Sequence, residues 1–170
     1  MDYYLYKKTC CNKGGQDKSD LDVRVFCPKP WKPALDKEDI GLKTYLVRMS
    51  FWLSTRGKFK IFYVLKDHKI AHTSYQIPKC GKFAFMKKGD LEIGPCETKD
   101  EFRGQGIYPK VINHITSSAQ STDTVFYMLV AEDNLPSIRG IEKAGFVRCG
   151  TAKKSGILKR YRLIDGDCNE

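Results

Sequence analysis

The sequence contains no apolar run long enough to cross a bilayer, which takes about 20 consecutive apolar residues in a helix. Its first residues, MDYYLYKKTC, also lack the basic and then apolar layout of a secretion signal. The composition, 41% hydrophobic and 29% charged, is typical of a globular protein, and 170 residues suffice for one domain with its own core. We therefore expect a single-domain cytoplasmic protein with no membrane span, either a monomer or a homodimer.

No C-x-x-C pair occurs among the 7 cysteines, whose number is odd and whose spacing is scattered. Only Cys10 and Cys11 are adjacent, and no second pair or histidine cluster accompanies them to complete a tetrahedral metal site. The pattern therefore argues against both a disulfide scaffold and a bound metal. It predicts ordinary reduced thiols.

The sequence also lacks any recognisable nucleic-acid-binding motif. Its 30 lysines and arginines against 20 acidic residues give a net charge of +10, spread along the chain rather than gathered in a tail. Such a surface attracts polyanions, including phosphorylated cofactors and nucleotide-linked substrates, and it also aids solubility. We expect no nucleic-acid partner, although a nucleic-acid-binding protein that uses its basic surface stays open as an alternative.

Apolar periodicity predicts an alternation of strands and helices over most of the chain. Two connectors, residues 12–20 and 27–33, are rich in Gly, Asp, Lys or Pro. The order predicts an α/β fold with a mixed, mostly antiparallel sheet, whose parallel pair is joined by a helix. The expected strands are 21–27, 59–65, 69–77, 82–86, 91–98, 124–131, 146–150 and 157–164, and the expected helices are 40–53, 108–119 and 134–144.

Gly94 and Pro95 interrupt the strand predicted at 91–98, because proline donates no hydrogen bond to a ladder. We expect a bulge or a splayed strand end there. Regular alternation would put Glu92 and Cys96 on one face of the strand and Glu97 on the other, unless the break resets the phase.

Two glycines, Gly104 and Gly106, come just before the predicted helix at 108–119. The first N–H groups of a helix have no intrahelical partner and carry partial positive charge, and glycine lets an anion approach them closely. Pro109 fits the first turn, where its missing N–H is not needed. The stretch RGQGIYPK lacks the G-K-[ST] ending of a Walker loop and the third glycine of a dinucleotide fingerprint. It is compatible with a phosphate cradle, and a plain turn also explains two glycines.

RGQGIY (residues 103–108) resembles the acyl-CoA pyrophosphate loop, R/Q-x-x-G-x-G/A, of the GNAT superfamily of N-acetyltransferases. NLPSIRGIEKAGF (residues 134–146) resembles the second signature of that superfamily, an Asn, a small residue three positions on, and then E-K-x-G-F. The resemblance covers residues 58–164. It implies a GNAT-like α/β fold with a splayed parallel strand pair and flanking helices. Residues 1–57 match only loosely, and we expect them to roof the acceptor site.

By this resemblance the cofactor is acetyl-CoA. The main-chain amides of residues 103–108 would hold its pyrophosphate, and the backbone of residues 96–98 would run beside the pantetheine arm. Asn134 would cap a helix and contact the cofactor, and basic side chains on that helix could face the phosphates. The implied cofactor-binding residues are Cys96, Glu97, Thr98, Arg103, Gly104, Gln105, Gly106, Ile107, Tyr108, Asn134, Ser137, Arg139 and Lys143.

Acetyl transfer to an amine needs a base for the proton of the amine and a hydrogen-bond donor for the developing oxyanion. Glu92 and Glu97, beside the expected position of the thioester, are the candidate bases. The tyrosine that many relatives carry just before E-K-x-G-F is Ile141 here. Protonation of the departing thiolate would then come from Ser137, another tyrosine or water.

Two further residue types have alternative interpretations. Cys96 could be an acyl-enzyme nucleophile or a small buried hydrophobe, and no nearby histidine in the sequence supports the former. His72 and His114 are expected to be packing or surface residues, with His72 able to point into an acceptor cleft. Tyr108 stands where the family pattern has a small residue.

The sequence therefore predicts an acetyl-CoA-dependent N-acetyltransferase whose acceptor is a primary amine that attacks directly. A small acceptor, such as an amino sugar or a nucleotide-linked amine, fits the charge of +10, and a protein N-terminus or lysine stays open. An acyl-CoA-binding regulatory module without turnover is the alternative from another class, and the missing tyrosine favours it.

Overall fold

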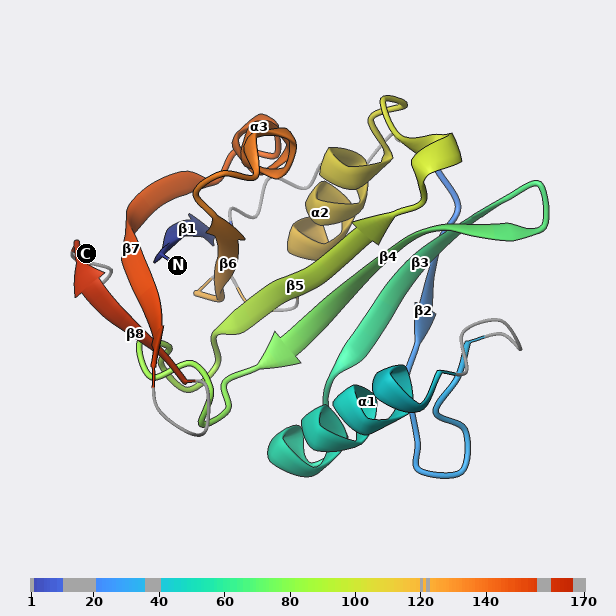
Figure 1. Ribbon diagram of the computed structural model, residues 1–170, viewed down its shortest axis with the longest axis horizontal. Coiled ribbons are helices and arrows are strands. Elements are labelled where there is room, and N and C mark those ends of the chain that lie inside the picture. The colour runs from blue at the N-terminus through green and yellow to red at the C-terminus, as the bar shows by residue number, and fades with distance from the viewer. Residues whose placement is uncertain are drawn as a thin grey trace.

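The computed structural model describes residues 2–10, 21–35, 41–119, 121, 123–155 and 160–166. These residues form an eight-stranded mixed sheet in the order β2-β3-β4-β5-β6-β1-β7-β8, with helices on both faces (Figure 1). The strands are β1 (Asp2–Thr9), β2 (Val23–Phe26), β3 (Lys60–Lys66), β4 (Lys69–Pro78), β5 (Leu91–Thr98), β6 (Val125–Ala131), β7 (Val147–Ser155) and β8 (Arg160–Asp165). The helices are α1 (Leu42–Thr55), α2 (Ile107–Ser117) and α3 (Leu135–Lys143), with a short 3-10 helix, η2 (Asp100–Phe102), before α2.

Each face of the sheet has its own core. Ile107, Val111 and Ile115 follow helical spacing along α2, and they pack with α3 against one face. On the opposite face, α1 contributes Phe51 and the segment between β4 and β5 contributes Phe83. The sheet is therefore a middle layer, and a site that passes through it would connect the two faces.

The predicted α/β fold is confirmed, with β5 and β6 parallel and joined through α2. The strand predicted at 82–86 is wrong, because this stretch forms turns with a bridge from Phe83 to Tyr161. Phe83 and Met86 are three residues apart and both pack into the same core, which the alternating faces of a strand do not allow. The connector predicted at 12–20 and residues 157–159 of the last predicted strand lie outside the described residues.

β1 lies in the interior of the sheet, antiparallel to β6 on one side and to β7 on the other (Figure 1). Its neighbouring residues Leu5 and Tyr6 are both buried, and they pack into the cores on opposite faces. A strand covered on both faces has no alternation of apolar and polar residues, so the sequence carries no clear strand signal here. β1 therefore completes the sheet and is not part of the roof expected for residues 1–57.

β5 and β6 separate soon after they begin. Their parallel pairing consists of Leu91 with Phe126 and Glu92 with Tyr127. The Gly94-Pro95 peptide that follows is cis, and the register between β5 and β4 shifts at this point. The disturbance predicted at Gly94-Pro95, a bulge or a splayed strand end, is thus confirmed: β5 has a bulge here and separates from β6.

The bulge also resets which side chains share a face. Ile93 pairs with Gln76 and Cys96 with Ser74, so β5 carries one more residue than β4 between these pairs. Ile93 and Cys96 consequently face α2, whereas Glu92 and Glu97 lie on the opposite face. The common face predicted for Glu92 and Cys96 under regular alternation is therefore wrong, because the extra residue inverts the phase.

Candidate active site

The glycine loop before α2 borders open space. Gly104 and Gly106 have φ angles of 77° and 69°, in the left-handed region that favours glycine, and a Cβ on either would meet no atom within 4 Å. Gly106 is the N-cap of α2, and no side chain caps this end of the helix. The first N–H groups of α2 therefore lie at an open surface with the positive end of the helix dipole, which suits an anion.

A cavity of about 580 Å³ extends from this loop across the end of β5 to α3. Its lining includes every predicted cofactor-binding residue except Gln105, whose side chain instead accepts a hydrogen bond from Lys66. We call this cavity the cofactor cleft. Its full lining is Cys96, Glu97, Thr98, Phe102, Arg103, Gly104, Gly106, Ile107, Tyr108, Pro109, Asn134, Pro136, Ser137, Arg139, Gly140 and Lys143.

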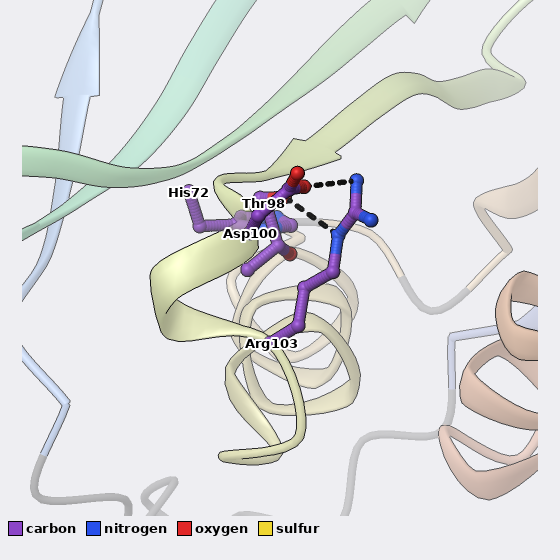
Figure 2. Close-up of polar contacts among 4 residues, drawn as sticks. All are labelled: His72, Thr98, Asp100 and Arg103. Atoms are coloured by element: carbon purple, nitrogen blue, oxygen red, sulfur yellow. Dashed lines mark hydrogen bonds and ion pairs between the residues drawn. The ribbon is translucent and has the colours of Figure 1, made fainter.

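Two side chains fix the rims of the cofactor cleft. Asn134 caps α3 as predicted, accepting a hydrogen bond from the Ser137 N–H at 3.2 Å. Figure 2 shows the Arg103 guanidinium reaching back to the end of β5, where Nε donates to the Thr98 carbonyl at 3.2 Å. The same guanidinium pairs with the Asp100 carboxylate at 2.8 Å. Arg103 is thus held at the rim of the cofactor cleft with its charge partly balanced.

A line of polar side chains joins the lining of the cofactor cleft to two buried residues of β4. The Nδ1 of His72 lies 2.7 Å from the Thr98 hydroxyl, and its Nε2 lies 2.7 Å from the Ser74 hydroxyl. The Ser74 hydroxyl in turn donates to Cys96 Sγ at 3.2 Å. Burial lowers the pKa of His72 to about 4, so its imidazole is neutral and joins the two hydroxyls as donor to one and acceptor from the other.

This line identifies the role of His72 and of Cys96 more closely than the sequence does. His72 is a buried structural link between strands, not a group in an acceptor cleft. Burial raises the pKa of the Cys96 thiol to about 12, which keeps it protonated and weakly nucleophilic. The sequence does not reveal this line of polar side chains, because the residues that form it come together only when β4 and β5 pair.

Tyr108 fits into the wall of the cofactor cleft because α3 has a glycine opposite it. A Cβ on Gly140 would lie 2.5 Å from Tyr108 Cδ1 and 2.7 Å from Cε1. The Tyr108 hydroxyl forms a hydrogen bond with Cys96, and burial raises the pKa of the phenol, so it stays protonated. Ile141, which stands where many relatives have tyrosine, is 1% exposed in the core.

A second cavity, of about 330 Å³, is lined by residues from both faces of the sheet at the point where β5 and β6 separate. We call it the through-sheet cavity. Cys96, Tyr108, Asn134 and Ser137 line both this cavity and the cofactor cleft. The remainder of its lining is Val47, Phe51, Lys82, Phe83, Glu92, Ile93, Gly94, Pro95, Met128, Leu129, Val130, Ala131 and Tyr161.

Glu92 is the buried carboxyl group of the through-sheet cavity. It is 5% exposed, and its Oε2 has no hydrogen-bond partner among the described residues. Burial raises the pKa of Glu92 well above its ordinary value, and the charge of Lys82 opposes this only in part. Gly94 is needed beside it, because a Cβ there would lie 2.7 Å from Glu92 Oε1 and its φ is 152°.

The two candidate bases therefore occupy different surroundings. Glu97, near the end of β5, is exposed and contributes to the lining of the cofactor cleft, whereas Glu92, on the same face of the strand, is enclosed in the through-sheet cavity. Glu92 combines burial, a raised pKa and an unpaired oxygen at a cavity. These are features of a carboxyl group adapted to proton transfer.

Neither a membrane span nor a metal site is found in the part of the chain that the structure describes. No helix there combines the length and apolar composition that crossing a membrane requires. No group of three or more His, Cys, Asp or Glu side chains is placed there to hold a metal ion.

Comparison with known proteins shows similarity of fold without similarity of sequence. No protein-family model and no curated protein matches the chain. A GNAT-family acetyltransferase from Colwellia psychrerythraea has a TM-score of 0.57 and 13% identity, over 87% of this chain and 53% of that one. A GCN5-related N-acetyltransferase from Sphaerobacter thermophilus has a TM-score of 0.58 and 14% identity, over 88% of this chain and 49% of that one.

A functionally unknown conserved protein from Staphylococcus epidermidis is similar too, with a TM-score of 0.55 and 14% identity over 88% of this chain and 58% of that one. The chain thus spans about half the length of the structures it matches. At these identities the likeness concerns the fold, and the chain has the GNAT fold that the sequence predicts.

Proposed function

We propose that this chain, with its GNAT fold, is an acetyl-CoA-dependent N-acetyltransferase that acts on a primary amine. One observation carries the proposal: a cavity through the sheet shares four lining residues with a cleft that suits an anion, and it holds a buried, unpaired carboxyl group on the opposite face. A thioester carrier bound in the cleft could present its acyl group at the gap, and an amine could reach it from the other side.

The cofactor cleft suits a phosphorylated, extended carrier. The amides at the start of α2 would bind the pyrophosphate, with Arg103, Arg139 and Lys143 adding positive charge at the rim. Beyond the last pair with β6, one edge of β5 is free of that strand, and its backbone from Cys96 to Thr98 lines the cleft. Pantetheine amides would pair with this edge, as a further strand would. The carrier would supply the activated acyl carbon, and the residues of the chain would bind it and transfer the protons.

Glu92 is the proposed general base. The amine must lose a proton as it attacks, and a carboxylate can accept that proton directly or through one water. A carboxyl group whose pKa is raised by burial is a stronger base than an ordinary one and is better matched to neutral pH. Glu97 is exposed and is kept only as a contact of the cofactor.

Tyr108 is the proposed proton donor to the departing thiolate. It lines both cavities, its hydroxyl lies at Cys96 where β5 separates from β6, and its phenol is protonated. Ser137 also lines both cavities and is the alternative donor. The hydroxyl that relatives place on the second signature helix would thus come from the helix that follows the glycine loop.

The acceptor is proposed to be a small amine, such as an amino sugar or a nucleotide-linked amine. The through-sheet cavity, at about 330 Å³, is at the lower end of the range for small-ligand sites. The charge of +10 favours an acceptor that carries negative charge elsewhere in the molecule. A protein N-terminus or lysine is the second candidate acceptor.

The test is release of CoA thiol from acetyl-CoA across a panel of amines, with binding measured in parallel by calorimetry. We expect turnover with at least one amine, and a loss of roughly 100-fold or more in Glu92→Gln with binding of CoA retained. Glu132→Gln, which replaces an exposed carboxylate outside both cavities, is the matched control. Tight binding of acetyl-CoA without turnover on any amine would instead favour the regulatory module.

A further inference from the structure

Lys82 occupies the wall of the through-sheet cavity that faces away from the cofactor cleft. It lies in the segment between β4 and β5, and it lines the cavity together with Glu92. Its Nζ is 5.1 Å from the ring centroid of Phe51, 5.5 Å from that of Phe83 and 5.6 Å from that of Tyr161. The rings come from α1, from the segment itself and from β8, and all three line the same cavity.

This arrangement is unusual for a lysine, which normally keeps its ammonium in water. Three aromatic faces favour a cation at this point, and Glu92 favours it further when its carboxyl group is ionised. Burial is nevertheless the largest influence, and it lowers the pKa of Lys82. The fraction of neutral, nucleophilic amine is therefore increased on the far wall of the same cavity that Gly94, Pro95 and Cys96 line beside the expected position of the thioester.

We propose that Lys82 is itself an acetyl acceptor, so that the chain acetylates its own Lys82 from acetyl-CoA bound in the cofactor cleft. The inference rests on the proposed function, because it uses the same carrier and the same base. It goes further by assigning a modification site and by identifying the ring-lined wall as a place where an alkyl ammonium binds.

The chemistry balances without a further reactant. Nζ of Lys82 attacks the carbonyl carbon of the thioester, an N–C bond forms, and the C–S bond breaks. The proton that leaves the nitrogen passes to the Glu92 carboxylate, and the thiolate takes a proton from Tyr108. The products are an amide at Lys82 and the free thiol of CoA.

The test is a map of acetylation sites after incubation of the purified full chain with isotopically labelled acetyl-CoA. Lys87 and Lys88 are matched internal controls, since they are exposed and belong to the same segment between β4 and β5. We expect label at Lys82 to appear roughly 100-fold faster than at either control. This factor lies in the lower part of the range of rate enhancements that a positioned general base gives. A chemical acetylating reagent without CoA should reverse the order, because it reaches exposed lysines first.

Three further measurements sharpen the test. The rate per molecule at Lys82 should not change on dilution of the protein, as expected for reaction within one chain. Glu92→Gln should lose the label at Lys82 while slow labelling of Lys87 and Lys88 persists. Lys82→Arg keeps a cation between the rings but has no amine to acetylate, so it should lose the fast labelling. Its control, Lys88→Arg, should keep the fast labelling of Lys82.

Labelling of Lys82 no faster than that of Lys87 would overturn the inference, as would a rate that falls on dilution. If the same protein then released thiol with an added amine, the proposed function would stand without it. If acetyl-CoA neither bound nor reacted, both would fall. The map on the unsubstituted chain distinguishes these outcomes even where a variant fails to fold.

Discussion

Replacing Gly140 with alanine would force the Tyr108 ring out of its place in the wall of the cofactor cleft. The new Cβ would lie 2.5 Å from Cδ1 and 2.7 Å from Cε1 of the ring. Carbon atoms pack best at about 3.5–4.0 Å, so the ring or α3 must move by about 1 Å. Overpacking of this kind costs about 1–3 kcal/mol. The higher helix propensity of alanine offsets about 1 kcal/mol of that, because Gly140 lies within α3.

The effect of Gly140→Ala on the free energy of unfolding should change sign when the Tyr108 ring is absent. In a Tyr108→Ala background the three ring atoms nearest to the Cβ of Ala at position 140 are gone, and Gly140→Ala should stabilise the protein by up to about 1 kcal/mol. In the unsubstituted background the same change should destabilise it by up to about 2 kcal/mol. Equilibrium urea unfolding of the four proteins measures both values and their coupling.

Activity provides a second readout of the same change. Displacement of the Tyr108 hydroxyl from Cys96 should slow thiol release by about 100-fold, the cost of a 1 Å misplacement at a reacting group. Gly81→Ala is a suitable control, because a Cβ there meets no atom within 4 Å. If Gly140→Ala stabilised the protein equally in both backgrounds and left turnover unchanged, the reasoning about the ring and its hydroxyl would be refuted.

Individual side chains and one glycine give three further predictions. Because burial raises the pKa of Glu92, the native state favours its protonated form and loses stability as pH rises through that raised pKa. Glu92→Gln has no such loss, so the difference in Tm between the variant and the unsubstituted chain should shift in favour of the variant as pH rises. A difference in Tm that does not change with pH would argue against a buried carboxyl group. Burial lowers the pKa of His72 from 6.5 to about 4, so the free energy of unfolding should fall by up to about 3 kcal/mol as pH falls through this window. His72→Gln should flatten this dependence of the free energy of unfolding on pH, measured by urea titration. Gly106→Ala places a side chain at a φ of 69°, and it should cost about 1–2 kcal/mol and weaken binding of CoA in calorimetry; unchanged binding would mean that the loop does not hold the phosphates.

Local sequence patterns predict the parts of this molecule that depend on neighbouring residues. The glycine loop before α2 and the cap of Asn134 on α3 are such cases, since a left-handed φ and an N-cap are each determined by a few neighbouring residues. The disturbance at Gly94-Pro95 is another, and the fold class follows from the order of the elements. The resemblance to GNAT signatures lies in the same short stretches.

The remaining features depend on contacts between distant segments. β1 shows no alternation because both of its faces are covered, and its place between β6 and β7 depends on pairing over more than 100 residues. The bulge in β5 reversed the expected face of Cys96, since one extra residue changes every later side chain. Lys82 lies near three rings and lines the same cavity as Glu92 only because a predicted strand forms turns instead, which brings Phe83 against β8.

A crystal structure with acetyl-CoA bound tests the proposed mechanism most directly. We expect pyrophosphate oxygens on the amides at the start of α2, and the thioester carbonyl at the gap between β5 and β6, facing Glu92 through the sheet. A carrier bound elsewhere, or one whose acyl group points away from that gap, would contradict the mechanism.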